Sequence, residues 1–170
     1  LHRFRERGHE RLFGVEIDEE CIIAGVGWGL NVVHCDLDRG LGFFGDGQFD
    51  TVILSRTLQA IHDVEGIVDE MLRVGRRCII SVPNFGYYKL TERFAETGRM
   101  PAAALLHYRW YNTPNIRVMT LRDFVDFCAE RNVRIEKTIA LDTEAGTEVP
   151  AGDDPDTRAD MAIYVISKGD

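Results

Sequence analysis

The sequence contains no apolar run that approaches the roughly 20 residues needed to cross a bilayer, and it shows no signal peptide. It also lacks a CxxC motif and any cysteine and histidine pair at the spacing of a zinc site. Cys35 and Cys78 lie inside strand-like apolar runs, which favours buried free thiols over a disulfide framework. These absences predict a soluble protein of the reducing cytoplasm without a metal site.

Positive charge is scarce as well. Lys and Arg number 20 against 28 Asp and Glu, which gives a net charge of −8 at pH 7. This balance argues against a nucleic-acid partner. The one dense basic stretch, Leu1–Arg11, is predicted to be the solvated face of a helix. A chain of 170 residues can bury one sizeable core, so residues 1–170 are expected to form a single domain.

A strand, helix and strand unit lies at the centre of the chain. Two short apolar runs, Thr51–Leu54 and Cys78–Val82, are typical of strands that are covered on both faces. Between them apolar residues recur at helical spacing, with Asp63 placed to cap the helix and Gly75 placed to end it in a left-handed conformation. Because a crossover of this length joins parallel strands, ligands are expected beyond the carboxyl ends of the strands.

The remaining elements continue this alternation. Asp18 can cap a short helix, and Thr120 with Asp123 forms a capping-box pattern before another. The acidic segment Asp142–Asp160 has no apolar pattern and is predicted to be a mobile hairpin loop. Further strands are expected at Leu12–Ile17, Asn31–Cys35, Val133–Leu141 and Met161–Ser167, and further helices at Glu19–Ala24, Thr120–Glu130 and Tyr87–Glu96, the last closed by Gly98. The order predicts an α/β, Rossmann-like doubly wound domain whose mostly parallel sheet ends in an antiparallel hairpin.

Acidic residues follow two of the predicted strands. Glu16 and Asp36 stand where these strands end, so in a parallel sheet both lie at the edge where nucleotide-type ligands bind. A carboxylate at such a strand tip can accept hydrogen bonds from both hydroxyls of a ribose, which gives Glu16 a ligand-binding interpretation. The structural alternative is that Asp18 caps a helix and Asp36 belongs to a turn.

Several motifs between Leu1 and about Asp142 resemble one protein family. They are LFGVEID at Leu12–Asp18, FDTVILSRTLQA at Phe49–Ala60, MLRVGRR at Met71–Arg77, SVPNFG at Ser81–Gly86, GRMP at Gly98–Pro101 and YRWYNTPNI at Tyr108–Ile116. In these motifs the chain resembles the methionine biosynthesis protein MetW family, which belongs to the class I S-adenosylmethionine-dependent methyltransferase superfamily. The SVPNFG and YRWYNTPNI segments make the resemblance specific.

The resemblance implies a cofactor site for S-adenosylmethionine. Matching the family position by position, Glu16 would hold the ribose, Asp36 with the backbone of Leu37 would meet the adenine, and Ser55 would lie beside the methionine moiety. The family's first strand and its glycine-rich turn are expected upstream of Leu1, so residues 1–170 on their own are expected to bind the cofactor poorly. The resemblance also implies a cytoplasmic protein that acts with homoserine O-acyltransferase.

An insertion at about 86–118 leaves two interpretations open. As the wall of an acceptor pocket it would serve a small-molecule methyltransferase, since aligning an acceptor is most of what methyl transfer requires. As a docking surface it would serve a methyltransferase-fold partner protein, because Trp and Tyr are enriched at interfaces. A closed pocket favours the first and an exposed apolar patch the second. The candidate substrate or partner residues are Asn84, His107, Tyr108, Trp110, Tyr111 and Asn112.

Two further alternatives carry less weight. His62 precedes a predicted helix and is a candidate base, although such a residue is more often ordinary surface. An NAD-dependent oxidoreductase would share Glu16 and the sheet, but Asp36 and the terminal strand pair suit S-adenosylmethionine better.

Overall fold

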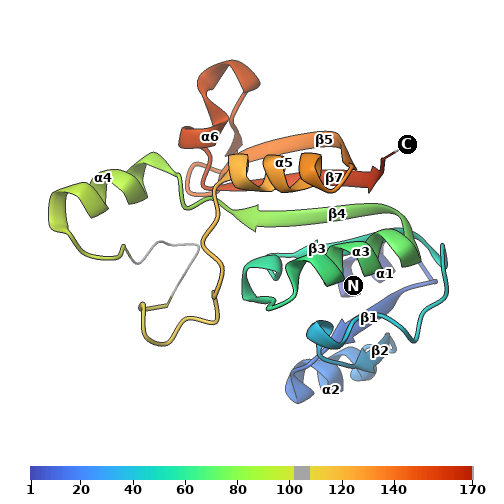
Figure 1. Ribbon diagram of the computed structural model, residues 1–170. Coiled ribbons are helices and arrows are strands. Elements are labelled where there is room, and N and C mark those ends of the chain that lie inside the picture. Colours follow the sequence, from blue (N-terminus) through green and yellow to red (C-terminus); the bar gives the residue numbers. More distant parts are fainter. Residues whose placement is uncertain (102–107, 170) are drawn as a thin grey trace.

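The computed structural model describes residues 1–101 and 108–169, and the chain in it forms two β-sheets with helices packed against them (Figure 1). One sheet pairs β1 and β2 in parallel, and the other has the strand order β3-β4-β7-β5-β6. The strands are β1 (Phe13–Glu16), β2 (Asn31–His34), β3 (Phe49–Ser55), β4 (Gly75–Pro83), β5 (Val133–Asp142), β6 (Thr147–Glu148) and β7 (Met161–Lys168).

The central unit has the predicted geometry. Strands β3 and β4 pair in parallel, with Ser55 opposite Ser81 at their carboxyl ends. Strand β7 runs antiparallel to both β4 and β5, so it lies between them and the predicted antiparallel pair at the end of the chain is confirmed. Strands β3, β4 and β5 therefore point the same way. The α/β fold class predicted from the sequence is confirmed.

Most helices begin at the residues that the sequence predicts. Asp18 accepts a hydrogen bond from Cys21 N, Asp63 accepts one from Gly66 N, and Thr120 forms a full capping box with Asp123. The helices are α1 (His2–Glu6), α2 (Glu19–Gly27), α3 (Val64–Val74), α4 (Tyr88–Thr97), α5 (Leu121–Glu130) and α6 (Pro155–Arg158), with short 3₁₀ turns η1 (Leu37–Arg39), η2 (Leu58–Ala60) and η3 (Ala151–Asp153). None of the helices in the described part of the chain is long and apolar enough to span a bilayer.

One core joins α3, α5 and the larger sheet. Apolar side chains of α3 and α5 pack in a single buried cluster with those of β4 and β7. At its surface Arg131 pairs with Glu65 and Asp69, which fastens the end of α5 to α3. Burial of this apolar surface is the main stabilising contribution. The two sheets with their packed helices are called the body below.

Two sequence predictions are corrected here. Gly75 does not adopt a left-handed conformation: its backbone is extended, and β4 starts at this residue directly after α3. A Cβ atom at Gly75 would lie 2.5 Å from Val52 Cγ2 and 3.1 Å from the Met71 carbonyl oxygen, so glycine is required by close approach. Segment Asp142–Asp160 is also more regular than predicted, since it contains β6, η3 and α6.

The buried side chains of Asn84 and Asp160 organise that acidic segment. Asp160 accepts hydrogen bonds from the backbone N and the hydroxyl of Thr143. The amide of Asn84 donates to the carbonyl oxygens of Asp156 and Ala159. These bonds satisfy backbone groups from inside the fold, which an apolar pattern cannot predict.

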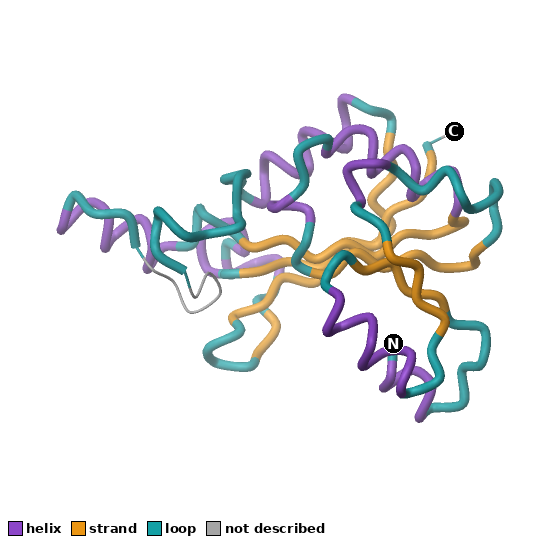
Figure 2. Tube along the Cα trace, turned by 90° about the horizontal axis from the view of Figure 1, so that it is seen from below, coloured by secondary structure: helices purple, strands orange, loops and turns teal. Residues whose placement is uncertain are grey.

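Residues 86–101 and 108–118 project from the body (Figure 1). Figures 1 and 2 both show α4 at the outer end of the molecule, away from the sheets. No residue of α4 is buried. The residues 86–101 and 108–118 are called the arm below. That the chain forms one domain with an insertion at these positions stays a prediction.

Candidate functional site

The carboxyl ends of the strands β1, β2, β3 and β4 lie on one side of the body. At their amino ends β1 and β3 meet through Phe13 and Phe49, whose ring centroids are 5.7 Å apart. At the opposite end Asp38, which follows β2, contacts His62, which follows β3. Strands β1 and β2 therefore run in the same direction as β3 and β4, and Glu16, Asp36 and Ser55 share one edge, as a cofactor site of this fold requires.

Glu16 is the last residue of β1. Its Oε1 accepts hydrogen bonds from the backbone N of Ile17 at 2.8 Å and of Asp18 at 3.0 Å. These two bonds fix the carboxylate by one oxygen, and no bond to Oε2 occurs within the described residues. A carboxylate held in this way can present its second oxygen to a ribose hydroxyl. The arrangement fits the predicted role of Glu16.

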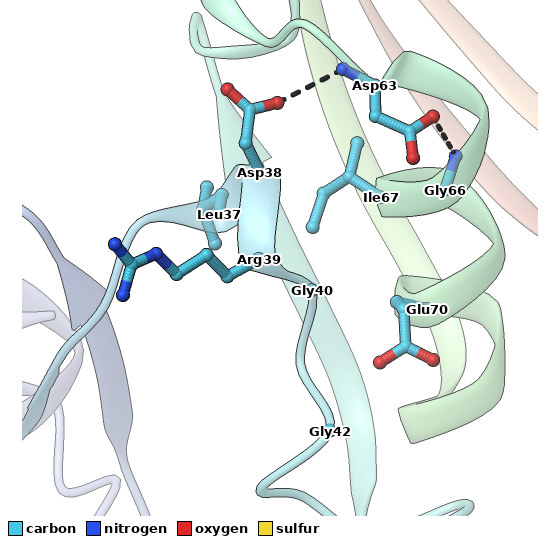
Figure 3. A pocket seen from close by; sticks show the side chains of 9 residues that line it. All are labelled: Leu37, Asp38, Arg39, Gly40, Gly42, Asp63, Gly66, Ile67 and Glu70. Atoms are coloured by element: carbon cyan, nitrogen blue, oxygen red, sulfur yellow. Dashed lines mark hydrogen bonds between the residues drawn. The ribbon is translucent and has the colours of Figure 1, made fainter.

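Asp36 and Leu37 lie where the chain leaves β2. Asp36 Oδ1 accepts a hydrogen bond from Asp38 N at 3.0 Å and so caps the turn η1. Leu37 is half-buried and lines a pocket of about 290 Å³ between η1 and α3 (Figure 3). Both the structural interpretation of Asp36 and the ligand-binding one are compatible with this position. The adenine contact stays a prediction.

The acidic side chains around this pocket are engaged in holding the fold. Asp63 caps α3 through Gly66 N (Figure 3). Glu70 accepts hydrogen bonds from Leu41 N and from the guanidinium of Arg73. The hydrogen bond from the Arg73 side chain is the main reason why the pKa of Glu70 is lowered. The described residues contain no group of three or more His, Cys, Asp or Glu that could hold a metal ion.

Asp38 joins the exit of β2 to the exit of β3. Its Oδ1 accepts from the backbone N of His62 and of Asp63, and its Oδ2 lies 2.9 Å from His62 Nδ1. The hydrogen bond from Asp63 N, followed by the one from the His62 ring, lowers the pKa of Asp38 below its usual range. The His62 side chain is exposed. The geometry thus gives His62 a structural tie, while its role as a base stays a prediction.

Ser55 ends β3 beside a strained residue. Ser81 Oγ donates to Ser55 Oγ at 3.3 Å and accepts from Arg56 N at 3.0 Å. Arg56 has a φ of 53°, a left-handed conformation that costs about 1–2 kcal/mol for a residue with a side chain. Strain of this kind gathers at ligand and switch sites because only a surrounding structure that fixes it can keep it. Ser81 therefore holds both Ser55 and the strained Arg56 at the carboxyl end of β3.

Gln59 in η2 lies directly beyond this tip and is buried. Its Nε2 donates to the carbonyl oxygen of Arg56 at 2.6 Å. Its backbone oxygen accepts from the backbone N of Ile116 and of Arg117, both at 2.9 Å, which ties the base of the arm to the strand tip. Gln59 Oε1 has no hydrogen-bond partner in the part of the chain that is described.

The predicted substrate or partner residues divide into two sets. Asn84 is buried, and its side-chain amide contacts backbone groups: Nδ2 donates to Asp156 O and Ala159 O, and Oδ1 accepts from Gly86 N. Tyr108, Trp110, Tyr111 and Asn112 lie in the arm and are exposed. His107 lies outside the described residues. The structure therefore does not bring Asn84 together with the aromatic residues in one pocket wall.

The aromatic residues of the arm contact one another. Trp110 and Tyr111 meet edge to face with ring centroids 5.6 Å apart, and Arg109 donates to the Tyr111 hydroxyl. Asn112 Oδ1 accepts from Arg109 N and closes the turn. The Trp110 side chain is 77% exposed and that of Tyr111 is 61% exposed. They form an exposed patch.

Three residues at this edge were not predicted from the sequence to have a role there: Asp38, Gln59 and Ser81. A signal existed for Ser81, because serines at the exits of adjacent parallel strands must face each other when the register matches. The sequence contains no such signal for Asp38 and Gln59, because polar residues are common in loops and their partners are visible only in the folded chain.

Sequence comparison identifies the family. The profile of the family described as methionine biosynthesis protein MetW matches residues 1–166. A curated relative from Rhodopirellula baltica, the bifunctional methionine biosynthesis protein MetXA/MetW, is 42% identical over 159 residues, which cover 93% of this chain and 26% of the relative. The chain thus spans about a quarter of the length of that relative.

Structure comparison identifies the fold. A Thermotoga maritima S-adenosylmethionine-dependent methyltransferase, described as a possible histamine N-methyltransferase, matches with a TM-score of 0.65 and 15% identity over 92% of this chain and 72% of that one. A Mesorhizobium loti S-adenosylmethionine-dependent methyltransferase matches with a TM-score of 0.65 and 14% identity, over 96% and 83%. Because the profile covers almost the whole sequence, the chain belongs to the MetW family of methionine biosynthesis proteins, and it has the fold of S-adenosylmethionine-dependent methyltransferases.

Proposed function

We propose that this chain acts in methionine biosynthesis as a cytoplasmic, methyltransferase-fold partner of homoserine O-acyltransferase. The exposure of Trp110 and Tyr111 carries this proposal. Large aromatic side chains on a projecting arm match the composition of interface hot spots, in which Trp, Tyr and Arg dominate the binding energy. An exposed apolar patch of this kind supports docking rather than enclosure of a small acceptor.

The bifunctional relative supports the choice of partner. Its name joins MetXA and MetW in one polypeptide, and we take the MetXA part to be the acyltransferase. Covalent linkage raises the effective concentration of two modules, which is useful when they work on each other. A separate MetW chain would need a docking surface in place of that linkage.

We also propose S-adenosylmethionine as the ligand of the carboxyl edge. Glu16 would hold the ribose with its second oxygen, Asp36 and Leu37 would meet the adenine, and Ser55 would face the methionine moiety. The fit rests on the fixed carboxylate of Glu16 and on the shared edge of the three strand exits. When bound, this cofactor supplies a methyl group on a positively charged sulfur.

Active transfer of that methyl group to a small molecule is the second candidate function. The observation in its favour is Gln59, whose unpaired Oε1 lies just beyond Ser55. A buried carbonyl oxygen can orient an acceptor hydroxyl or amine. The two candidates share the cofactor site and differ in the role of the arm.

Isothermal titration calorimetry on the full-length protein tests the partner proposal. We expect homoserine O-acyltransferase to bind, and Trp110→Ala to weaken binding at least tenfold, since truncating a hot-spot residue costs about 2 kcal/mol or more. Trp28→Ala is the matched control, because Trp28 is also exposed but lies after α2 in the body. Absence of binding by the unchanged protein, or equal losses in both variants, would count against docking through the arm.

A further inference from the structure

Gln59 is the feature of the carboxyl edge that the structural roles described above leave unexplained. The residue is 7% exposed, and its amide orientation is set by the bond from Nε2 to Arg56 O. Its backbone oxygen receives two bonds from the arm. The side-chain oxygen is the one polar atom of this residue that is buried without a donor among the residues described.

A buried carbonyl oxygen without a donor is unfavourable, since it has lost its hydrogen bonds to water and gained none in return. Such a group in a native protein calls for an explanation, for example a water, an ion or a ligand at the site. The strained backbone of Arg56 lies three residues before Gln59, so strain and an unpaired acceptor occur together at the exit of β3. This coincidence is typical of a ligand site.

Two other buried polar atoms lack partners in the described part of the chain, and neither marks a site. Arg131 Nε belongs to a guanidinium whose other nitrogens pair with Glu65 and Asp69 in the body. The Tyr87 hydroxyl lies at the base of the arm near the ammonium group of Lys89, which helps to balance it. Gln59 alone of the three stands at the predicted cofactor edge.

We propose that Gln59 Oε1 faces the sulfur-bearing end of the cofactor site and accepts a hydrogen bond from a hydroxyl or amine placed there. The inference rests on the proposed S-adenosylmethionine site. Ser55, predicted to lie beside the methionine moiety, ends β3, and η2 with Gln59 follows within four residues. The negative end of the amide dipole would also favour a positively charged sulfur over a neutral one.

Binding of S-adenosylmethionine and of S-adenosylhomocysteine, measured by calorimetry on the full-length protein, tests this assignment. The two ligands differ by one methyl group and the positive charge on sulfur. Gln59→Glu places a carboxylate at the site, and within about 10 Å of the sulfur it should raise the preference for S-adenosylmethionine about tenfold. Gln59→Met removes the amide dipole at similar volume, so the preference should fall, by about threefold.

Gln48→Glu is the matched control. Gln48 precedes β3 at its amino end, and its Oε1 accepts from Gly45 N, a bond that a carboxylate can also accept. The same charge is thereby added at the opposite end of the same strand. The preference between the two ligands should stay unchanged in this variant.

The outcomes separate the inference from the proposed function. If the unchanged protein binds neither ligand, the proposed cofactor site is wrong and the inference falls with it. If it binds both, but folded Gln59→Glu and Gln59→Met leave the preference unchanged, Gln59 faces away from the sulfur and the inference alone is wrong. If the buried carboxylate of Gln59→Glu prevents folding, the ligand preference of Gln59→Met decides whether Gln59 faces the sulfur.

Discussion

Aromatic side chains lie in opposite environments in the body and in the arm. In the body Phe124 and Tyr164 pack with ring centroids 4.5 Å apart, and both are almost fully buried. In the arm Trp110 and Tyr111 contact each other but remain exposed. Burial makes the first pair a source of stability, whereas exposure leaves the second pair available to another molecule. The same type of residue thus serves folding in one region and, in the proposed function, recognition in the other.

Charge separates the two regions as well. Residues 86–118 contain five Lys or Arg and two Asp or Glu, although the whole chain carries −8. If the arm docks as proposed, its basic and aromatic composition suits a partner surface that is apolar at its centre and acidic at its rim. Attraction of this kind weakens as salt rises, because charges near the surface are screened.

The largest expected difference between the regions comes from the same substitution made in each. Tyr164 is 1% exposed, so Tyr164→Ala should lower the free energy of unfolding by about 3–5 kcal/mol. Tyr111→Ala removes an exposed ring of the arm and should change it by about 0.5 kcal/mol or less. Urea unfolding followed by circular dichroism measures both. Similar losses in the two variants would show that the arm belongs to the cooperative core.

Substitution of two glycines, one in each region, should have smaller effects on stability. Gly75→Ala would press a methyl group against Val52 and the Met71 carbonyl, which should cost about 1–3 kcal/mol of global stability. Gly98 ends α4 with a φ of 62° and has no atom within 4 Å of a built Cβ, so Gly98→Ala should cost about 1–2 kcal/mol through the backbone alone.

The cost at Gly98 should be confined to the arm. Hydrogen exchange is expected to show faster exchange of the α4 amides in Gly98→Ala, with the urea midpoint of the body unchanged. Gly75→Ala should instead lower that midpoint. A global loss in Gly98→Ala would contradict the separation of the two regions.

The sequence alone was sufficient to predict those features of the fold whose signal is local. Caps at Asp63 and Thr120, and the short apolar runs of β3 and β4, follow from residues within a few positions of one another. The insertion of β7 between β4 and β5 depends on pairing between distant segments, for which no local rule exists. Gly75 was misjudged for the same reason, since its neighbour Val52 is far along the chain.

The candidate site could be predicted only in part. Acidic Glu16 stands at a strand tip, and that position alone indicates the ligand edge. The side-chain amide of Asn84, a candidate substrate or partner residue, also holds the segment before β7, and this structural role could not be predicted from the sequence. Burial decides between these roles, and burial of a polar residue is not encoded in its neighbours.

The smallest expected effect is the change in stability at low pH. Asp38 and Asp123 in the body have lowered pKa values because backbone N–H groups of Asp63 and Thr120 donate to them. A carboxylate whose folded pKa is lowered stabilises the protein above its unfolded pKa of about 4, and this contribution is lost as pH falls through the folded value. The body should therefore lose stability below about pH 4.

Asp38→Asn tests that link between the two strand exits. It should lower stability at pH 7 by about 1 kcal/mol, because an amide accepts the bonds from Asp63 N and the His62 ring less strongly than a carboxylate. The difference from the unchanged protein should shrink between pH 7 and pH 3, because the stabilisation from a carboxylate with a lowered pKa fades once pH falls below its unfolded pKa of about 4. Asp126→Asn, on the exposed face of α5, is the control and should change the free energy of unfolding by about 0.5 kcal/mol or less. Urea unfolding at both pH values measures the effect, and a deficit that stays constant between them would mean that Asp38 does not act through its charge.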